Sequence, residues 1–126
     1  MDFDNSKPIY LQIVELFYEN ILLKRWLENE RIPSVREIAM MVEVNPNTAI
    51  RAFTYLQEQE VIYNKRGIGY FVSNDGYKKV LEIKRQEFME ETLPDVFKKM
   101  KLLDIQFEEV KSSFNQYLKN TDHEEK

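Results

Sequence analysis

The sequence has no cysteine, which excludes disulfide bonds, thiolate nucleophiles and cysteine-ligated zinc. Its single histidine, His123, lies near the end of the chain, so no convincing catalytic set pairs histidine with serine or cysteine. There is no Gly-x-x-x-x-Gly-Lys phosphate loop, and the paired glutamates fit solvated helix faces better than metal sites. We therefore expect neither an enzyme nor a metal or other cofactor.

Long apolar runs are also lacking. None approaches the roughly 18 residues of a transmembrane helix, and the chain starts with the acidic Met1-Asp2-Phe3-Asp4 rather than a basic leader. The 126 residues, 43% of them hydrophobic and 13% aromatic, suffice for one compact domain with an appendage. We expect a soluble cytoplasmic protein that makes no membrane contact.

Glycine is rare, and two of the three glycines fall in one short run. The run is Lys65-Arg66-Gly67-Ile68-Gly69-Tyr70, and it lies between two apolar pieces at 61–63 and 70–72. Glycines between short apolar segments are typical of a tight turn that joins two strands. The sequence therefore predicts a β-hairpin with a basic tip.

Positive charge is outnumbered, because 18 lysines and arginines face 22 acids and the net charge is -4. An acidic balance argues against a nucleic-acid partner. Contact with phosphates depends, however, on the local field within a Debye length of about 8–10 Å. Residues 45–57 contain one arginine and no acid, and residues 61–74 contain two cations and no acid. The few positive charges are thus placed together.

Three helices are predicted before the hairpin. Apolar residues at helical spacing follow Pro8, which suits the first turn of a helix. After a polar connection, Ser34 and Glu37 match a capping box, in which each side chain satisfies the backbone of the other, so a second helix starts there. Asn45 and Pro46 suit the N-cap and the first position of a third helix.

The third helix has two different faces at about 100° per residue. Asn47, Arg51 and Thr54 face outward, whereas the inward side holds Ala49, Ala52, Phe53 and Leu56. Two helices joined by a short turn, with the second presenting hydrogen-bond donors beside a basic hairpin, are typical of a winged helix-turn-helix that binds the DNA major groove. The alternative is a solvated helix in any small α+β domain.

Residues 77–126 are rich in lysine and glutamate and have helical periodicity. Thr92-Leu93-Pro94 is expected to kink or break this run, a last helix starts near Asp104 or Gln106, and residues 119–126 are expected to fray. Two apolar stripes result, namely Leu93, Val96, Phe97 and Met100, then Phe107, Val110, Phe114 and Leu118.

These stripes either fold back as intramolecular core or pair with the same stripes of a second chain about a two-fold axis. Two short helices separated by a proline cannot bury both stripes completely, so a partner surface is favoured. The predicted fold is mostly helical α+β, with a winged helix-turn-helix domain at residues 1–76 and a two-helix dimerisation tail at residues 77–126.

Four stretches together resemble a known family. They are Pro8-Ile9-Tyr10-Leu11-Gln12-Ile13, Ile32-Pro33-Ser34-Val35-Arg36-Glu37-Ile38-Ala39, Val44-Asn45-Pro46-Asn47-Thr48-Ala49-Ile50-Arg51-Ala52-Phe53 and Lys65-Arg66-Gly67-Ile68-Gly69-Tyr70-Phe71-Val72. In order and spacing they are similar to the DNA-binding domain of GntR-type bacterial transcriptional regulators. The Asn-Pro-Asn-Thr turn and the short helical tail are most similar to the YtrA subfamily, whose tails mediate dimerisation.

The resemblance implies a set of DNA-binding residues on the second helix, the third helix and the hairpin, or wing. They are Ser34, Arg36, Asn45, Asn47, Thr48, Arg51, Lys65, Arg66, Gly67 and Gly69. The chain departs from the family pattern at Glu43, where glycine is usual, and at residues 24–29, which lack the family's glycines. Glu43 would bring an acid close to DNA and weaken binding.

We therefore expect a homodimeric transcriptional repressor that binds a palindromic operator in double-stranded DNA. One alternative, which the negative charge and Glu43 favour, is a winged-helix protein-interaction module without specific DNA binding. A small enzyme is a weaker alternative. The roughly 50 residues after the wing leave little room for a ligand pocket, so an effector would have to bind in a cleft at the dimer interface, or none exists. The sequence assigns neither the operator nor the regulated genes.

Overall fold

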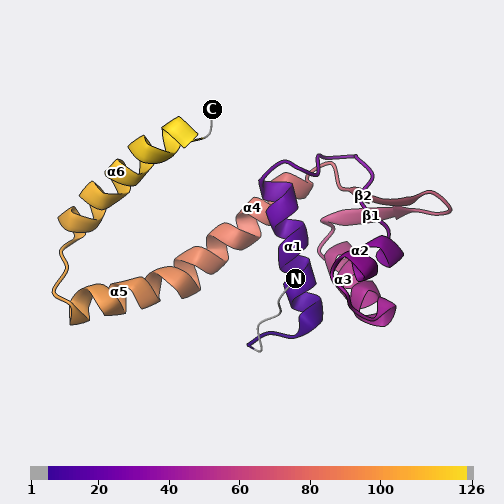
Figure 1. The fold of residues 1–126 in the computed structure, drawn as a ribbon, viewed down its shortest axis with the longest axis horizontal. Helices are drawn as coiled ribbons and strands as arrows, with labels where there is room; N and C mark the ends of the chain where they lie inside the picture. Colours follow the sequence, from indigo (N-terminus) through magenta and orange to yellow (C-terminus); the bar gives the residue numbers. More distant parts are fainter. Residues whose placement is uncertain (1–5, 125–126) are drawn as a thin grey trace. The chain divides into compact units, whose positions relative to one another are not determined.

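The computed structural model describes residues 6–124, with side chains as far as Asp122, so the side chain of His123 lies outside the described part. The elements follow in the order α1 (Ile9–Leu22), α2 (Val35–Met41), α3 (Pro46–Glu58), β1 (Ile62–Lys65), β2 (Gly69–Val72), α4 (Gly76–Glu87), the π-helical turn η1 (Phe88–Thr92), α5 (Leu93–Leu102) and α6 (Phe107–Glu124) (Figure 1). The predicted class, a winged helix-turn-helix followed by further helices, is confirmed.

The chain forms two compact units, one up to Lys84 and one from Arg85 onward. The division lies inside α4, whereas the sequence places it at the beginning of that helix. The reason is that the first turns of α4 pack on the first unit. Val80 is fully buried there, and Lys84 Nζ lies 2.7 Å from Glu15 Oε2 on α1.

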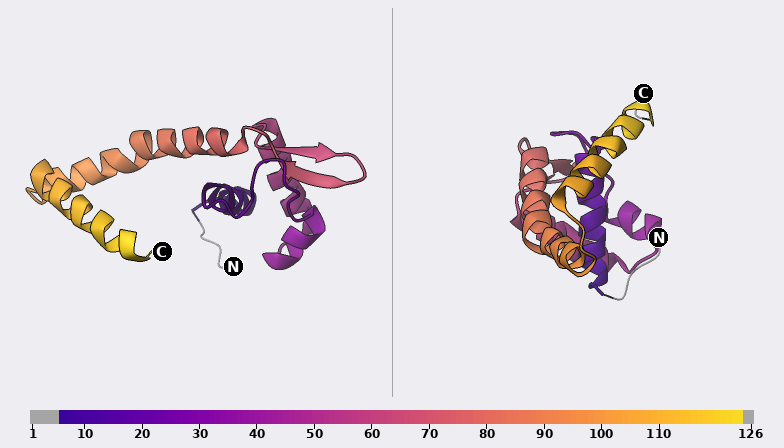
Figure 2. Two further views of the ribbon diagram at one scale, coloured as in Figure 1. Left: turned by 90° about the horizontal axis from the view of Figure 1, so that it is seen from above. Right: turned by 90° about the vertical axis from the view of Figure 1, so that its left-hand side faces the viewer.

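The first unit is built around α1, which is seen end-on in the left view of Figure 2. The predicted first helix is confirmed, with Pro8 as its N-cap residue. Its Phe17 ring meets Phe53 of α3 edge-on at 5.1 Å and Trp26 at 5.0 Å. The inward face predicted for α3 is also confirmed, since its buried residues are Ala49, Ala52, Phe53 and Leu56.

The helix-turn-helix begins with the predicted capping box. Ser34 Oγ accepts a hydrogen bond from the Glu37 N–H at 3.1 Å, and Glu37 Oε1 accepts one from the Ser34 N–H, also at 3.1 Å. At the start of α3, the Asn45 side chain accepts from the Asn47 N–H at 2.8 Å, and Pro46 is the first helical residue. The two helices therefore start where the local signals predict.

The hairpin is antiparallel, and its register pairs Ile62 with Val72 and Lys65 with Gly69. The connection before α2 adds a short extended piece to this sheet. Arg31 forms an isolated bridge with Phe71, and the Ile32 N–H donates to the Tyr70 carbonyl at 2.9 Å. The wing is thus held on its β2 side as well as by its own strands.

The second unit has no buried side chain among its described residues. The expected kink is a π-helical turn, η1, which joins α4 to α5 without a break in the ribbon (Figure 1). Pro94 has no N–H for the carbonyl of Glu90 and its ring crowds that carbonyl, which the wider π turn accommodates. α6 continues to Glu124, so the fraying expected from residue 119 is absent as far as that residue.

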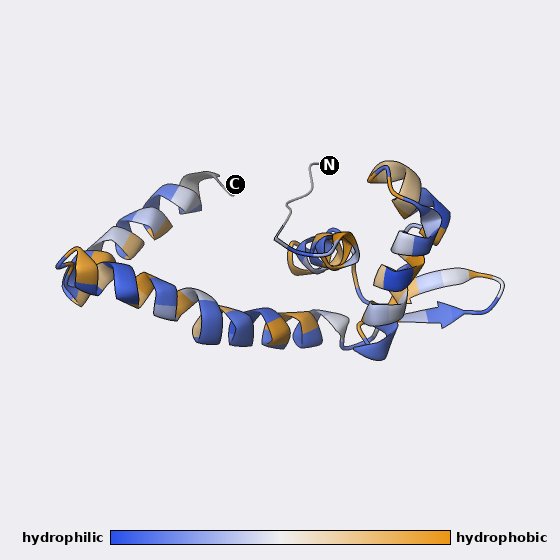
Figure 3. Cartoon of the chain, turned by 90° about the horizontal axis from the view of Figure 1, so that it is seen from below, coloured by the Kyte–Doolittle hydropathy of each residue, from blue (hydrophilic) through white to orange (hydrophobic). Residues whose placement is uncertain are grey.

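Apolar residues recur along these C-terminal helices, where orange segments interrupt the blue ribbon in Figure 3. Within the described part of the chain, no helix is both long and apolar enough to cross a membrane.

Candidate nucleic-acid interface

The outward face of α3 carries the predicted polar side chains. Asn47, Arg51 and Thr54 are exposed, and Thr48 is half-buried. Asn45 is exposed as well, but its side-chain oxygen accepts the bond from the Asn47 N–H that caps the helix. The first turns of α3 therefore present amide, hydroxyl and guanidinium groups to solvent with no acid among them.

Arg51 does not extend alone into solvent. Its guanidinium carbon lies 4.0 Å from the centre of the Tyr10 ring, which belongs to the first turn of α1. The same ring meets Tyr55 edge-on at 6.2 Å, with 68° between the ring planes. A cation over an aromatic face is attracted by the quadrupole of the ring. Tyr10 therefore holds the guanidinium against the body of the domain.

An open hollow of about 410 Å³ lies between the beginning of α1 and the first turns of α3. Its lining residues are Pro8, Ile9, Tyr10, Asn47, Thr48 and Arg51. Three of these residues belong to the predicted DNA-binding set, and the other three are the N-cap residue and the first two residues of α1. The sequence does not predict that α1 contributes to this surface, because the packing of α1 beside α3 depends on the core rather than on a local pattern.

Ser34 and Arg36 lie at the start of α2. Arg36 is exposed, whereas the Ser34 hydroxyl is already engaged in the capping box. Hydrogen bonds from the Ser34 backbone N–H and, next, the Ser34 hydroxyl lower the pKa of the Glu37 carboxyl, and Arg31 lowers it further. The structure thus gives the Ser34 hydroxyl a capping role that competes with any contact to DNA.

The wing presents Lys65 and Arg66 beside a stacked aromatic pair. Lys65 Nζ lies 4.7 Å from the centre of the Phe71 ring, which stacks on Tyr63 at 5.6 Å. Gly67 has a φ of 79°, and the Ile68 N–H closes the turn on the Lys65 carbonyl at 2.9 Å. Both cations are exposed, so the predicted basic tip is present.

Gly69 provides space for a residue that sequence reasoning missed. A Cβ placed on Gly69 would lie 2.9 Å from Arg31 Nε, and the φ of Gly69 is 145°. The Arg31 side chain therefore lies against Gly69, at the end of β2 next to the turn of the wing, where Gly69 pairs with Lys65 in the hairpin register. No local pattern in the sequence points to this contact, because it depends on the pairing of the segment around Arg31 with β2.

The positions at which the chain departs from the glycines of the resembled family have left-handed backbone. Glu43 has a φ of 56°, Lys24 of 60° and Asn29 of 63°. L-residues adopt this region rarely, which is why glycine suits such turns. The turn before α3 thus has the left-handed backbone that suits glycine, but at a residue with an acidic side chain.

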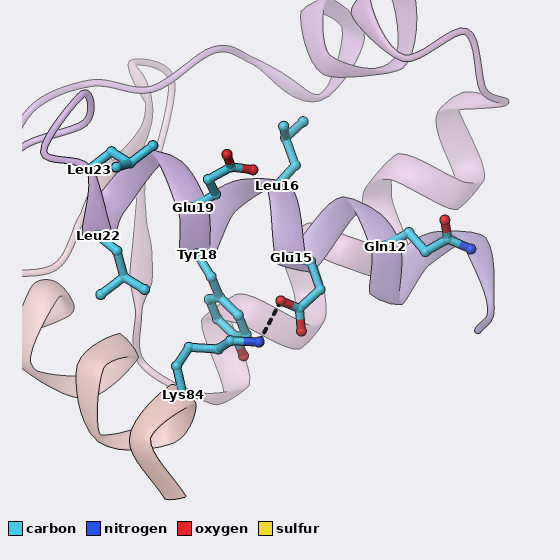
Figure 4. Close-up of a pocket in the computed structure, with 8 residues that line it drawn as sticks. All are labelled: Gln12, Glu15, Leu16, Tyr18, Glu19, Leu22, Leu23 and Lys84. Carbon is cyan, nitrogen blue, oxygen red and sulfur yellow. Dashed lines mark hydrogen bonds and ion pairs between the residues drawn. The ribbon is translucent and has the colours of Figure 1, made fainter. Parts of the chain in front are cut away.

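A second hollow lies elsewhere on the first unit and contains none of the predicted DNA-binding residues. It is lined by α1 and by Lys84, whose ammonium pairs with Glu15 (Figure 4). Among the described residues, no group of three or more histidine, aspartate or glutamate side chains is placed to hold a metal ion.

The residues predicted to pair between chains lie on α5 and α6. Leu93 and Met100 are half-buried, and the exposed ones are Val96, Phe97, Phe107, Val110, Phe114 and Leu118. Phe107 is 65% exposed and Phe114 57%, so these rings have little cover within the second unit.

Comparison with known proteins agrees with this geometry. The sequence profile described as "Bacterial regulatory proteins, gntR family" matches residues 9–72, from α1 to the end of the wing. The chain is 32% identical over 108 residues to the uncharacterised HTH-type transcriptional regulator YhcF of Bacillus subtilis, covering 86% of this chain and 88% of YhcF.

Two further proteins are similar. The HTH-type transcriptional repressor YtrA of Bacillus subtilis is 33% identical over 78 residues, which are 62% of this chain and 60% of YtrA. A crystal structure of a putative GntR-family regulator from Bacteroides thetaiotaomicron has 38% identity and a TM-score of 0.75, covering 90% of this chain and 99% of that one.

Proposed function

Because this chain belongs to the gntR family of bacterial regulatory proteins, and so is a helix-turn-helix transcriptional regulator that binds DNA, we propose that it binds a palindromic operator as a homodimer and represses adjacent genes. The similarity to YtrA, which is described as a repressor, supports the direction of regulation. The family consists of transcriptional regulators rather than enzymes. The proposed place of action is the cytoplasm.

In this proposal α3 enters the major groove. The observation that carries it is the outer face of α3, where exposed Asn47, Arg51 and Thr54 succeed one another by a helical turn and no acid precedes Glu58 at the end of the helix. Asparagine and arginine are suited to base edges, and threonine to bases or phosphates. We assign base reading to Arg51 and Asn47, with Asn45 and Thr48 beside them.

The wing and the start of α2 are assigned to the DNA backbone. Lys65 and Arg66 supply positive charge, while Gly67 and Gly69 let the wing backbone come close to phosphates. Arg36 and, where its capping bond allows, Ser34 contact the phosphates beside α2. With few cations on the proposed DNA-binding face of an acidic chain, the affinity of one copy is modest and falls steeply with salt.

Homodimerisation is supported by the exposed apolar side chains of α5 and α6. A unit that buries none of its described side chains needs a partner surface, and a second copy supplies the matching stripes about a two-fold axis. Two copies then place their α3 helices in successive major grooves, so the half-sites are expected about 10 base pairs, or a multiple of this spacing, apart.

Binding to operator and to random DNA tests which residues contact bases and which contact phosphates. The operator is first selected from a random pool with the unaltered protein, and affinities are then measured by fluorescence anisotropy at several salt concentrations. Arg51→Ala is expected to lose about 1–3 kcal/mol of discrimination at one base position. Lys65→Ala is expected to weaken all sequences alike and to reduce the salt slope by about one. Equal losses on operator and random DNA for Arg51→Ala would contradict the base-reading role.

A further inference from the structure

We propose that Tyr10 is a positioning residue for DNA recognition, which fixes the guanidinium of Arg51 where it meets a base edge. The inference rests on the proposed function in one respect, namely that Arg51 faces DNA. The observation behind it is the 4.0 Å distance between the guanidinium carbon and the centre of the Tyr10 ring.

An arginine on an exposed helix face is poorly suited to reading a base by itself. Its long side chain samples many rotamers, and holding one of them in a complex costs conformational entropy. A ring that already holds the guanidinium removes part of this loss before DNA arrives, which raises affinity without adding a contact. Arg51 is such a case, because it is exposed yet seated on Tyr10.

The ring itself is held by the same two helices. Tyr55 follows Arg51 by one helical turn on α3 and meets Tyr10 edge-on at 6.2 Å. On α1, the first turn is anchored by the Leu11 N–H, which donates to the Pro8 carbonyl at 3.1 Å. α1 and α3 are joined in the core through Phe17 and Phe53. The position of Tyr10 relative to α3 is therefore set by the packing of the domain.

A ring suits this purpose better than a carboxylate. A carboxylate would also orient the guanidinium, but it would neutralise the charge and occupy the N–H donors that DNA has to take over. None of the ion pairs among the described residues includes Arg51, and its guanidinium lies over the Tyr10 ring instead. The charge thus stays available for DNA while the side chain is held in place.

The wing repeats this arrangement with a second pair of residues. Lys65 lies 4.7 Å from the centre of the Phe71 ring, and that ring is itself stacked on Tyr63. Arg51 and Lys65, both proposed to contact DNA, therefore each lie over an aromatic ring whose position is set by the packing of the fold. Because few cations lie on the proposed DNA-binding face, holding each of them in place compensates in part for their small number.

Matched substitutions at residue 10 separate the ring face from the packing. Tyr10→Phe keeps the face, Tyr10→Leu keeps apolar bulk without it, and pentafluorophenylalanine at residue 10 keeps the shape but reverses the quadrupole. Affinities are measured for the selected operator and for its single-base variants, and thermal unfolding is recorded for each protein. The isosteric pair of phenylalanine and pentafluorophenylalanine gives an answer even if Tyr10→Leu fails to fold.

Tyr10→Phe is expected to read the operator as the unaltered protein does. Tyr10→Leu and the pentafluoro variant are expected to lose about two- to fivefold in discrimination, and only at the base position where Arg51→Ala loses it. In the Arg51→Ala background, Tyr10→Leu is expected to add no further loss at that position, because the two residues act as one unit.

Equal discrimination by the phenylalanine and pentafluorophenylalanine variants would overturn the inference, as would additive losses in the double variant. If Arg51→Ala itself loses no discrimination, the base-reading role in the proposed function is wrong. If Arg51→Ala loses discrimination and the ring variants do not, the function stands and only the role of Tyr10 is wrong.

Discussion

At the scale of single residues, the turn between α2 and α3 depends on Glu43. Its φ of 56° is in the left-handed region, where an L-residue is disfavoured by about 1–2 kcal/mol relative to glycine. Glu43 is exposed and directly precedes the segment that leads into α3. The residue thus combines a backbone strain, which acts on stability, with a negative charge, which acts on DNA affinity.

These two effects separate in two variants of Glu43. Glu43→Gly is expected to raise the free energy of unfolding by about 1 kcal/mol, because glycine adopts the left-handed conformation without strain. Glu43→Gln keeps the strain and removes the charge, so it is expected to leave stability unchanged while both variants bind DNA more tightly at low salt. Urea unfolding and fluorescence anisotropy measure the two quantities, and a stability gain in Glu43→Gln would contradict the strain.

At the scale of elements, the capping box decides where α2 starts and makes its stability depend on pH. The hydrogen bonds from Ser34 lower the pKa of Glu37 below its ordinary value of 4.5. The folded state therefore binds this proton less readily than the unfolded state does. The stabilisation is fully present above pH 4.5 and is lost as the pH falls through the lowered pKa of the folded protein.

Glu37→Gln is the matched test of this pH dependence, because glutamine also serves in a capping box but does not titrate. Between pH 4.5 and the lowered pKa of Glu37, the stability of the unaltered protein is expected to fall more steeply than that of Glu37→Gln. Chemical unfolding at a series of pH values measures the two slopes. Parallel slopes would show that the Glu37 carboxylate makes no such contribution.

The wing depends on Gly69 in a different way from Gly67. A Cβ at Gly69 would meet Arg31 Nε at 2.9 Å, whereas a Cβ at Gly67 would meet nothing within 4 Å. The end of the exposed Arg31 side chain can move aside, so the backbone is expected to decide the cost. Gly69→Ala is expected to lower stability by about 1–3 kcal/mol, because its φ of 145° lies outside the left-handed helical region, and Gly67→Ala, with a φ of 79°, by less. Thermal unfolding of the two variants, and of Gly69→Ala combined with Arg31→Ala, measures this. Full recovery of stability in the combined variant would show that the contact with Arg31, and not the backbone, sets the cost.

At the scale of the whole molecule, the two units differ in how they bury apolar surface. The first unit has a core of its own around Phe17 and Phe53, whereas the described part of the second unit has no buried side chain. Exposed rings such as Phe97, at 52%, and Phe114, at 57%, support the proposal that a second copy covers this unit.

A charge placed in either apolar stripe is expected to separate the proposed dimer. Phe97→Glu and Phe114→Glu each bury a charge in the interface, so the chain is expected to sediment as a monomer at micromolar concentration and to bind operator at least tenfold more weakly through loss of the second copy. Lys98→Glu adds the same side chain on the opposite side of α5 and is the control. A dimer that persists in both phenylalanine variants would place the interface elsewhere.

Local signals in the sequence predicted the elements of the site well. The capping box at Ser34, the Asn45-Pro46 start of α3 and the glycine turn of the wing act over a few neighbouring residues, so the sequence alone specifies them. The inward and outward faces of α3 followed from helical periodicity in the same way.

Contacts between distant segments were decided only by the tertiary structure. Tyr10 beneath Arg51, Arg31 across Gly69 and the first turns of α4 on α1 each join segments that no local pattern relates, because the shared core sets their distances. The sequence by itself thus determined which side chains α3 and the wing present, since that depends on periodicity and turns. Which ring holds each of the cations Arg51 and Lys65 depended on packing, and only the folded chain decided it.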